Sequence, residues 1–239
     1  MYSAIMIDGP FFLRRIREIF PAHVHHDYKL VADLVWRLSA AHLFERNQPK
    51  RHLYRIFYYD YQLLAGVHLG PVLKDTQSYL DNAKINFQLA FHRQLQRKRK
   101  LAVRLAHESN PTHWKLTQEA NSLLLANKLQ HSELKNSHFQ PDKYSQGFEL
   151  KMGVDLATLA YKQQVKQVVL IMGDASFTGA AELLRHEGID VVLDPMWQDV
   201  PEDLFCYVDG LRSTCPAKDR VDDFLARLHT DNDPTYEGA

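Results

Sequence analysis

The sequence predicts an α/β fold with a mainly parallel sheet of about five strands. Two observations predict it. The short apolar runs at residues 4–7 and 168–172 each end next to a glycine and an acid, Asp8 and Asp174, as buried parallel strands often do. Segments with helical spacing alternate with such runs along the chain. Because ligands bind at the carboxyl ends of strands in open α/β sheets, both acids are expected at a ligand site.

Five segments are expected to be strands because they are short, apolar and rich in β-branched or aromatic residues. In order, they are residues 4–7, 53–59, 101–105, 168–172 and 189–193. The second is mostly aromatic, and the third alternates apolar with polar side chains. A further short strand is expected over residues 206–208.

Seven segments carry apolar side chains at the three- and four-residue spacing that is typical of helices. They are residues 11–20, 28–44, 80–96, 112–134, 148–165, 177–186 and 220–228. Pro21 should end the first, Asp75 or Thr76 should cap the third, and Gly188 should follow the sixth as its C′ residue. The fourth is expected to be a helical insertion near residues 112–135.

The remaining segments lack a regular pattern. Residues 60–75 are expected to form a loop, and residues 136–147 a loop at the active end of the sheet. Residues 231–239 are expected to be frayed. One domain over residues 1–213, followed by a C-terminal helix and tail over residues 214–239, is the simplest organisation for 239 residues.

Composition excludes several classes of protein. No stretch approaches the roughly 18–20 apolar residues that span a bilayer, and residues 1–3 do not begin a signal peptide. The two cysteines, Cys206 and Cys215, have no metal-ligand spacing and fit a reducing compartment. A cytoplasmic protein without a membrane segment is therefore expected.

Charge is balanced overall but uneven along the chain. The 29 basic residues equal the 29 acidic ones, yet residues 182–239 hold 14 acids and 5 bases. The densest basic run, residues 93–104, contains six bases and no acid. Two interpretations stay open, a solvated helix end and a track of phosphate contacts for nucleic acid.

Four acids are candidates for a metal site: Asp8, Glu149, Asp155 and Asp174. Glu149 and Asp155 are six residues apart, which leaves them about 120° out of alignment on a helix, so Asp155 is expected to orient the site rather than ligate. An oxygen-rich set of this kind suits Mg²⁺ or Mn²⁺. Without a metal, the clustered carboxylates should raise one another's pKa.

Several motifs together resemble the NYN domain family of the PIN-like nuclease superfamily, over most of residues 4–213. They are Leu53 to Asp60, Gln146-Gly147-Phe148-Glu149, Gly153-Val154-Asp155-Leu156, Gly173-Asp174-Ala175-Ser176-Phe177, Arg185 to Asp190, Asp194-Pro195-Met196-Trp197 and Asp209 to Ser213. The resemblance implies a three-layer α/β/α PIN-like sandwich. It also implies metal-dependent RNA cleavage that leaves a 5′-phosphate and a 3′-hydroxyl.

Carried over residue by residue, the resemblance makes Asp8, Glu149, Asp155 and Asp174 the catalytic acids, with Asp8, Glu149 and Asp174 as metal ligands. The chain departs from the family at three positions. Phe11 stands where the family has asparagine, Ser176 where it has a second aspartate, and Glu149 where it has an aspartate. Lower ligand charge predicts weaker metal binding.

Residues near the same end of the sheet are candidates for contacts with RNA. Arg14, Arg15 and Lys151 are expected to contact phosphates, and Ser176 to hydrogen-bond a metal-bound water.

Two functions stay open for the acidic site: a Mg²⁺- or Mn²⁺-dependent ribonuclease, and a PIN-like domain that binds RNA or a protein partner without cleavage. A phosphatase with Asp8 as nucleophile is a lesser alternative, because Pro10 replaces the second acid of its usual motif. A homo-oligomer is also open.

Overall fold

The computed structural model describes residues 1–45, 49–62, 68–69, 72, 76–77, 82–107, 114–141, 147–174 and 177–230. Its strands are β1 (Tyr2–Asp8), β2 (His52–Gln62), β3 (His68–Leu69), β4 (Thr76–Gln77), β5 (Leu101–His107), β6 (Trp114–Leu116), β7 (Phe139–Pro141), β8 (Gln167–Ile171), β9 (Asp190–Asp194) and β10 (Gly210–Leu211). Its α-helices are α1 (Gly9–Ile19), α2 (Ala22–His25), α3 (Tyr28–Ala41), α4 (Asn82–Gln96), α5 (Gln118–Leu125), α6 (Phe148–Tyr161), α7 (Thr178–His186), α8 (Glu202–Phe205) and α9 (Val221–Thr230).

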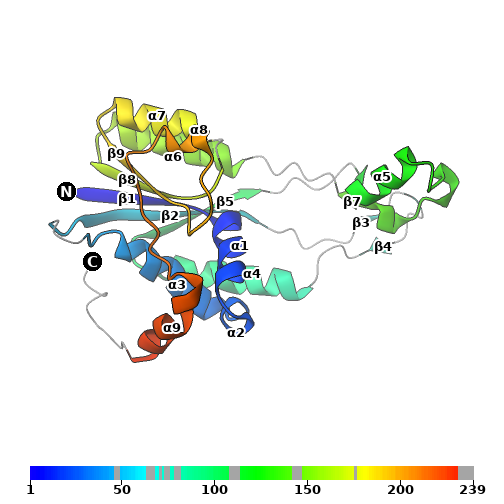
Figure 1. Cartoon of the computed structure of the whole chain (residues 1–239), viewed down its shortest axis with the longest axis horizontal. Coiled ribbons are helices and arrows are strands. Elements are labelled where there is room, and N and C mark those ends of the chain that lie inside the picture. The colour runs from blue at the N-terminus through cyan, green and yellow to red at the C-terminus, as the bar shows by residue number, and fades with distance from the viewer. Residues whose placement is uncertain are drawn as a thin grey trace.

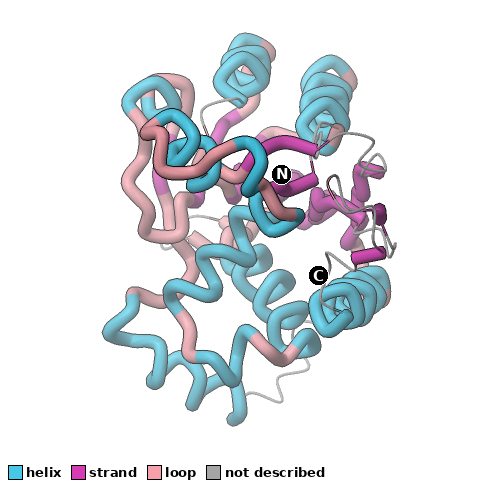
Figure 2. Tube along the Cα trace, turned by 90° about the vertical axis from the view of Figure 1, so that its right-hand side faces the viewer, coloured by secondary structure: helices cyan, strands magenta, loops and turns pink. Residues whose placement is uncertain are grey.

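The centre of the molecule is a six-stranded sheet in the order β10-β9-β8-β1-β2-β5. All five strand pairings in it are parallel. Helices cover both faces, with α6 and α7 on one side and α1, α3 and α4 on the other (Figures 1 and 2). The fold is the predicted three-layer α/β/α sandwich, and β10 adds a strand to the expected five.

Each face of the sheet has its own apolar core, because the side chains of a strand alternate between faces. Ile5 and Ile7 of β1 lie in the core beneath α1, α3 and α4, to which α9 also contributes Val221 and Leu225. Met6 lies in the core beneath α6, α7 and α8. Six of the seven residues of β1, all except Tyr2, and all five of β8 are buried, as expected of central parallel strands.

The turn from β1 into α1 packs closely against β2. Asp8 ends β1 and caps α1, and Pro10 in the first turn supplies a helix-compatible φ. Gly9 lies directly over β2, where an added Cβ would approach the carbonyl oxygen of Tyr59 to 2.4 Å and the Tyr58 ring to 2.8 Å. Only glycine fits between α1 and β2 at this position.

A small lobe lies beyond the carboxyl ends of β2 and β5 (Figure 1). It contains the antiparallel pairs β3–β4 and β6–β7 together with α5. In the chain, these segments follow β2 and β5 and precede α4 and α6. The lobe therefore belongs to the end of the sheet at which the candidate acids were predicted.

The lobe corrects the prediction of a helix over residues 112–134. Trp114–Leu116 is a strand that pairs with Phe139–Pro141, and the helix covers only Gln118–Leu125. Thr117 starts that helix by accepting a hydrogen bond from the N–H of Ala120 at 3.2 Å, and Asn127 follows it with a positive φ of 55°. Cap chemistry sets both ends, which apolar spacing alone does not reveal.

Other predicted segments also differ. The strand predicted at residues 206–208 is wrong, because these residues follow α8 without forming a strand and Gly210–Leu211 pairs with β9 instead. Residues 136–141 are a 3₁₀ turn and β7 rather than a loop. Thr76 belongs to β4 and does not cap α4.

Of the remaining loop and cap predictions, that for Gly188 is confirmed, that for residues 60–62 is wrong, and the others fall largely outside the described residues. Residues 60–62 extend β2. Gly188 has the predicted left-handed conformation, with φ 73°. Asp75, most of residues 63–75 and residues 231–239 lie outside the described residues.

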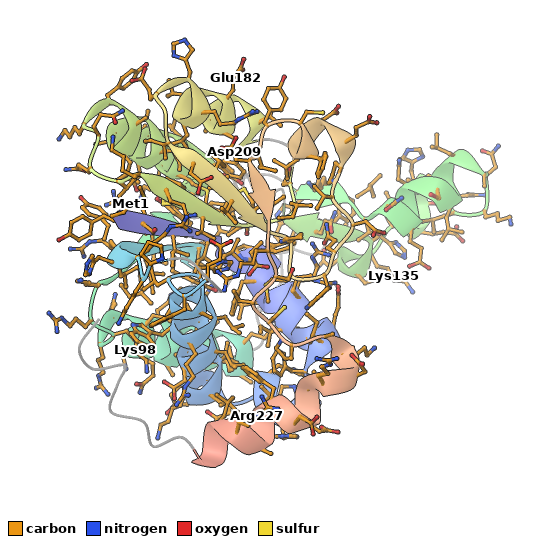
Figure 3. The ribbon with its side chains drawn as sticks, turned by 60° about the vertical axis from the view of Figure 1, so that its left-hand side comes forward. Met1, Lys98, Lys135, Glu182, Asp209 and Arg227 are labelled. Atoms are coloured by element: carbon orange, nitrogen blue, oxygen red, sulfur yellow. The ribbon has the colours of Figure 1, made fainter. Side chains whose placement is uncertain are left out.

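The basic run at residues 93–104 lies mainly at the opposite end of the sheet from the candidate acids. It connects the end of α4 to the start of β5, and Lys98 is on the same side of the molecule as Met1, away from Lys135 in the lobe (Figure 3). Lys98 is paired with Asp33, and Lys100 donates to the carbonyl of Leu53 at 2.9 Å. Among the described helices, none has the length and apolar character needed to cross a bilayer.

Candidate active site at the carboxyl end of the sheet

Asp8 is the buried centre of the candidate site. Its Oδ1 accepts a hydrogen bond from the N–H of Phe11 at 2.9 Å, and the residue is only 8% exposed. Burial raises the pKa of Asp8 from 3.8 to about 6; the Phe11 N–H opposes this, while Glu149, Asp174 and Asp60 add to it. Burial and the neighbouring negative charges therefore make Asp8 costly to ionise. Clusters of acids with raised pKa values are often found at cation sites.

Glu149 lies in the first turn of α6, where its carboxylate accepts two hydrogen bonds. The Tyr61 hydroxyl donates to Oε1 at 2.9 Å, and the Gly147 N–H donates to Oε2 at 3.2 Å. Gly147 has a φ of 149°, which the absence of a side chain makes accessible. The local chain and β2 together hold Glu149 at the end of the sheet.

Asp174 follows β8 and is exposed. Beside it, Phe11 packs so closely on Gly173 that a Cβ there would lie 2.5 Å from the Phe11 ring. The guanidinium of Arg14 lies over the same ring, 5.3 Å from its centroid. The aromatic ring of Phe11 therefore occupies the space between α1 and the segment that carries Asp174.

Asp155 is held by β2 and β5. The Tyr59 hydroxyl donates to Oδ2 at 2.8 Å, and Arg104 donates to both oxygens, with Nε at 2.9 Å from Oδ2. The hydrogen bonds that Arg104 donates to Asp155 raise the pKa of the guanidinium. Burial, followed by the charge of Asp155, raises the pKa of Tyr59. Both oxygens of Asp155 are thus engaged by the sheet.

Asp155→Asn is expected to lower the free energy of unfolding by about 1–2 kcal/mol, because the bidentate contact with Arg104 is lost. Urea denaturation at neutral pH measures the change. Glu182→Gln, at an exposed acid on α7, serves as the control and should stay within about 0.5 kcal/mol. Equal stability of Asp155→Asn and the unmodified protein would contradict a formed Asp155–Arg104 pair.

Asp60 is a further acid of this site that was not among the sequence candidates. It is 4% exposed, its Oδ2 lies 2.8 Å from Nε2 of His92 on α4, and Gln88 donates to the next carbonyl, that of Tyr61, at 2.9 Å. Its charge contributes to the raised pKa of Asp8. Asp60 directly follows the apolar run at residues 53–59, just as Asp8 follows the run at residues 4–7. The same sequence pattern therefore could have identified Asp60.

The basic candidates are engaged by the protein itself. Arg14 donates to Gln198 Oε1 at 2.9 Å, and Arg15 donates through Nε and Nη2 to the carbonyl of Met196. Lys151 donates to the carbonyl of Leu105. Ser176 lies outside the described residues.

The donor chemistry of Asp8, Glu149 and Asp174 fits a hard divalent cation, since all three supply carboxylate oxygens and two of them raise the pKa of the third. Their geometry is looser than that of a finished metal centre. Among the described residues, no three acids, histidines or cysteines lie close enough together to hold an ion.

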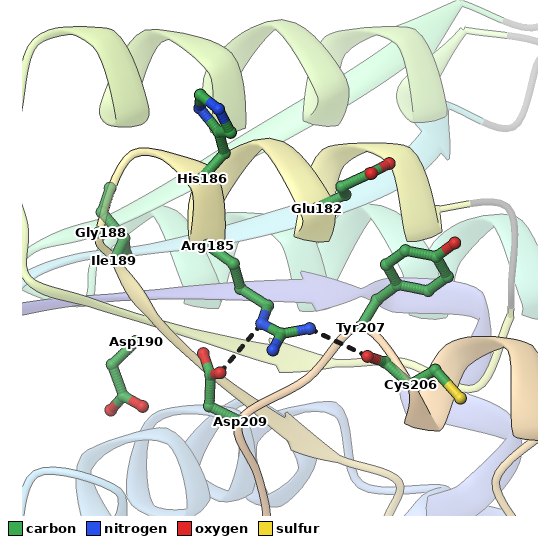
Figure 4. A pocket seen from close by; sticks show the side chains of 9 residues that line it. All are labelled: Glu182, Arg185, His186, Gly188, Ile189, Asp190, Cys206, Tyr207 and Asp209. Carbon is green, nitrogen blue, oxygen red and sulfur yellow. Dashed lines mark hydrogen bonds and ion pairs between the residues drawn. The ribbon is translucent and has the colours of Figure 1, made fainter.

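A separate groove of about 680 Å³ lies between α7, the start of β9 and the segment before β10 (Figure 4). Within it, Arg185 donates to Asp209 Oδ1 at 3.0 Å and to the carbonyl of Cys206 at 2.9 Å. Because Asp190 begins β9, this groove lies at the amino end of the sheet, apart from Asp8. The hydrogen bonds of Arg185 in this groove join α7 to residues 206–209.

Comparison with known proteins identifies one family. Residues 72–202 match the NYN domain, a range of more than half the chain that includes Glu149, Asp155 and Asp174. No curated protein sequence matches the chain. The crystal structure of a protein of unknown function from Vibrio parahaemolyticus RIMD 2210633 is similar over 89% of this chain and 91% of that one, with 13% identity and a TM-score of 0.44.

Proposed function

Because the chain belongs to the NYN domain family, part of the PIN-like nuclease superfamily, we propose that it is a metal-dependent ribonuclease. Its site is the acidic group formed by Asp8, Glu149 and Asp174 at the carboxyl end of the sheet. The observation that carries the proposal is the placement of Asp8, which is buried at the carboxyl end of β1 and near enough to Glu149 and Asp174 for their charges to add to the effect of burial in raising its pKa to about 6. A divalent cation would relieve that repulsion.

In this proposal, Mg²⁺ or Mn²⁺ supplies charge neutralisation and Lewis acidity toward an RNA phosphodiester. Asp8 would offer Oδ2 to the cation, because its Oδ1 caps α1. Glu149 is oriented by Tyr61 and Gly147, and Asp174, which is exposed, would be accessible to the substrate. Arg14, 52% exposed along its side chain, is the basic candidate best able to turn toward a phosphate; Ser176 stays a candidate for ordering water.

A second candidate function is a domain that binds RNA or a protein partner without cutting. Two observations favour it. Phe11, at a position where the family has asparagine, places its aromatic ring against Gly173. In the part of the chain that the structure describes, no three acids lie close enough together to hold an ion.

Incubation of a labelled RNA panel with purified protein and Mn²⁺ or Mg²⁺ distinguishes the two functions. Metal-dependent cleavage is expected from the unmodified protein, and it should fall to background in both Asp8→Asn and Asp174→Asn. Glu182→Gln is the control, since this exposed acid on α7 lines the separate groove at the amino end of the sheet, and it should retain cleavage.

Cleavage that survives both substitutions at Asp8 and Asp174 would overturn the assignment of the site. RNA binding that needs no metal and produces no cleavage would support the second function instead.

A further inference from the structure

Two tyrosines of β2 reach across to two acids of α6. Tyr59 and Tyr61 are two residues apart, so their side chains leave the same face of the strand. The Tyr59 hydroxyl donates to Asp155 at 2.8 Å, and the Tyr61 hydroxyl donates to Glu149 at 2.9 Å. The strand and the helix are therefore linked by two parallel hydroxyl–carboxylate contacts.

The spacing of these contacts matches the geometry of the two elements. Two residues of strand span about 7 Å, and the six residues from Glu149 to Asp155 span about 9 Å of helix. The helix runs back against the strand, since the earlier acid meets the later tyrosine. The six-residue interval between the acids thus fits the side-chain interval of β2.

The two contacts differ in their surroundings. Tyr59 is fully buried, and Asp155 is also bound by Arg104. Tyr61 is half-buried and packs edge-on against Phe148, with ring centroids 4.8 Å apart. The first contact anchors the helix to the sheet, whereas the second ends at an acid whose charge acts on Asp8.

A glutamate at this position needs more support than an aspartate does. Its longer side chain has more rotamers to lose on ordering, and the Gly147 N–H, at 3.2 Å, holds only Oε2. The Tyr61 hydroxyl fixes Oε1. The carbonyl of Tyr61 is itself fixed by Gln88 at 2.9 Å, so the strand end that carries the hydroxyl is tied to α4.

We propose that Tyr61 is the positioning residue for Glu149, selecting the side-chain conformation in which that carboxylate joins Asp8 in binding the cation, while Tyr59 has only a structural role. This inference rests on the proposed metal-dependent function. In this inference, the hydrogen bond from Tyr61 restricts the additional rotamers of Glu149, as hydrogen bonds to metal ligands commonly do.

Tyr61→Phe and Tyr59→Phe form a matched pair, because each removes one hydroxyl and keeps the ring. Thermal unfolding is followed as Mn²⁺ is titrated, alongside RNA cleavage. Tyr61→Phe should raise the Mn²⁺ concentration for half-maximal stabilisation by about tenfold or more and leave the metal-free melting temperature nearly unchanged. Tyr59→Phe should lower the metal-free melting temperature and leave the Mn²⁺ dependence unchanged.

A double-mutant cycle isolates the contact itself. In the Glu149→Gln background, Tyr61→Phe should cause no further change in Mn²⁺ dependence. If the unmodified protein responds to Mn²⁺ and Tyr61→Phe responds at the same concentrations, the positioning role is refuted. If the unmodified protein shows neither Mn²⁺ stabilisation nor cleavage, the proposed function fails first.

Discussion

Asp8→Asn is expected to make the protein more stable at neutral pH while it abolishes Mn²⁺ binding. Asparagine has nearly the same shape as aspartate, and its amide oxygen can still accept the hydrogen bond from the N–H of Phe11. It carries no charge to desolvate or to repel Glu149 and Asp174. The gain at pH 7.5 should approach about 3 kcal/mol, the equivalent of a two-unit rise in pKa.

The gain should depend on pH in a defined direction. The folded-state pKa of Asp8, about 6, exceeds its ordinary value of 3.8, so between pH 4 and 6 the folded state binds more protons than the unfolded state. The contribution of Asp8 to unfolding free energy therefore falls as pH rises through this window. Asp8→Asn should match the unmodified protein near pH 4 and exceed it increasingly up to about pH 7.

Urea denaturation at pH 4.5, 6.0 and 7.5, with and without Mn²⁺, measures both effects. Asp174→Asn is the control, because it removes an exposed charge near Asp8 and should give a smaller gain. Mn²⁺ should stabilise the unmodified protein at pH 7.5 and have no effect on Asp8→Asn. No gain in stability for Asp8→Asn at pH 7.5 would show that the charge of Asp8 is already neutralised.

Gly9→Ala is expected to destabilise the protein by about 3 kcal/mol or more. The new methyl group would lie 2.4 Å from the carbonyl oxygen of Tyr59, and a backbone atom of a central strand cannot move aside as a flexible side chain can. Either α1 or β2 must shift, and both carry residues of the candidate site. Urea denaturation and the Mn²⁺ titration should therefore both change.

Gly153→Ala provides a matched control on α6. An added Cβ there meets no atom within 4 Å, so the better helix propensity of alanine should stabilise the protein by about 0.5–1 kcal/mol. Similar effects of the two substitutions would contradict the close packing of α1 on β2.

The sheet was predictable because its strands are short, apolar and buried on both faces. Residues 4–7 and 168–172 have this pattern, and β1 and β8 are central neighbours in the structure. The lobe was harder to predict. Residues 112–134 contain enough apolar side chains for one helix, but Thr117 and Asn127 limit it to eight residues and leave Trp114–Leu116 to pair with β7.

The acids of the site were predictable individually but not in their contacts. Apolar runs that end in an acid located Asp8 and Asp174. Glu149 and Asp155 were candidates as a second pair of acids, and the resemblance then implied catalytic roles for all four. Arg104 and Tyr59 bind Asp155 from different strands. Arg15 donates a hydrogen bond to the carbonyl of Met196, which lies far from it in the sequence. Such pairings depend on strand order and register, which a single sequence does not contain.

The hydrogen bond that Asp8 makes as a helix cap also bears on which cation could bind. With Oδ1 engaged by the N–H of Phe11 and both oxygens of Glu149 accepting hydrogen bonds, the acids can offer little bidentate coordination. Ca²⁺ commonly takes six to eight oxygen ligands, some of them from bidentate carboxylates, whereas Mg²⁺ keeps several waters and uses one or two carboxylates. If the proposed site binds a cation, we therefore expect the capping geometry of α1 to favour Mg²⁺ over Ca²⁺.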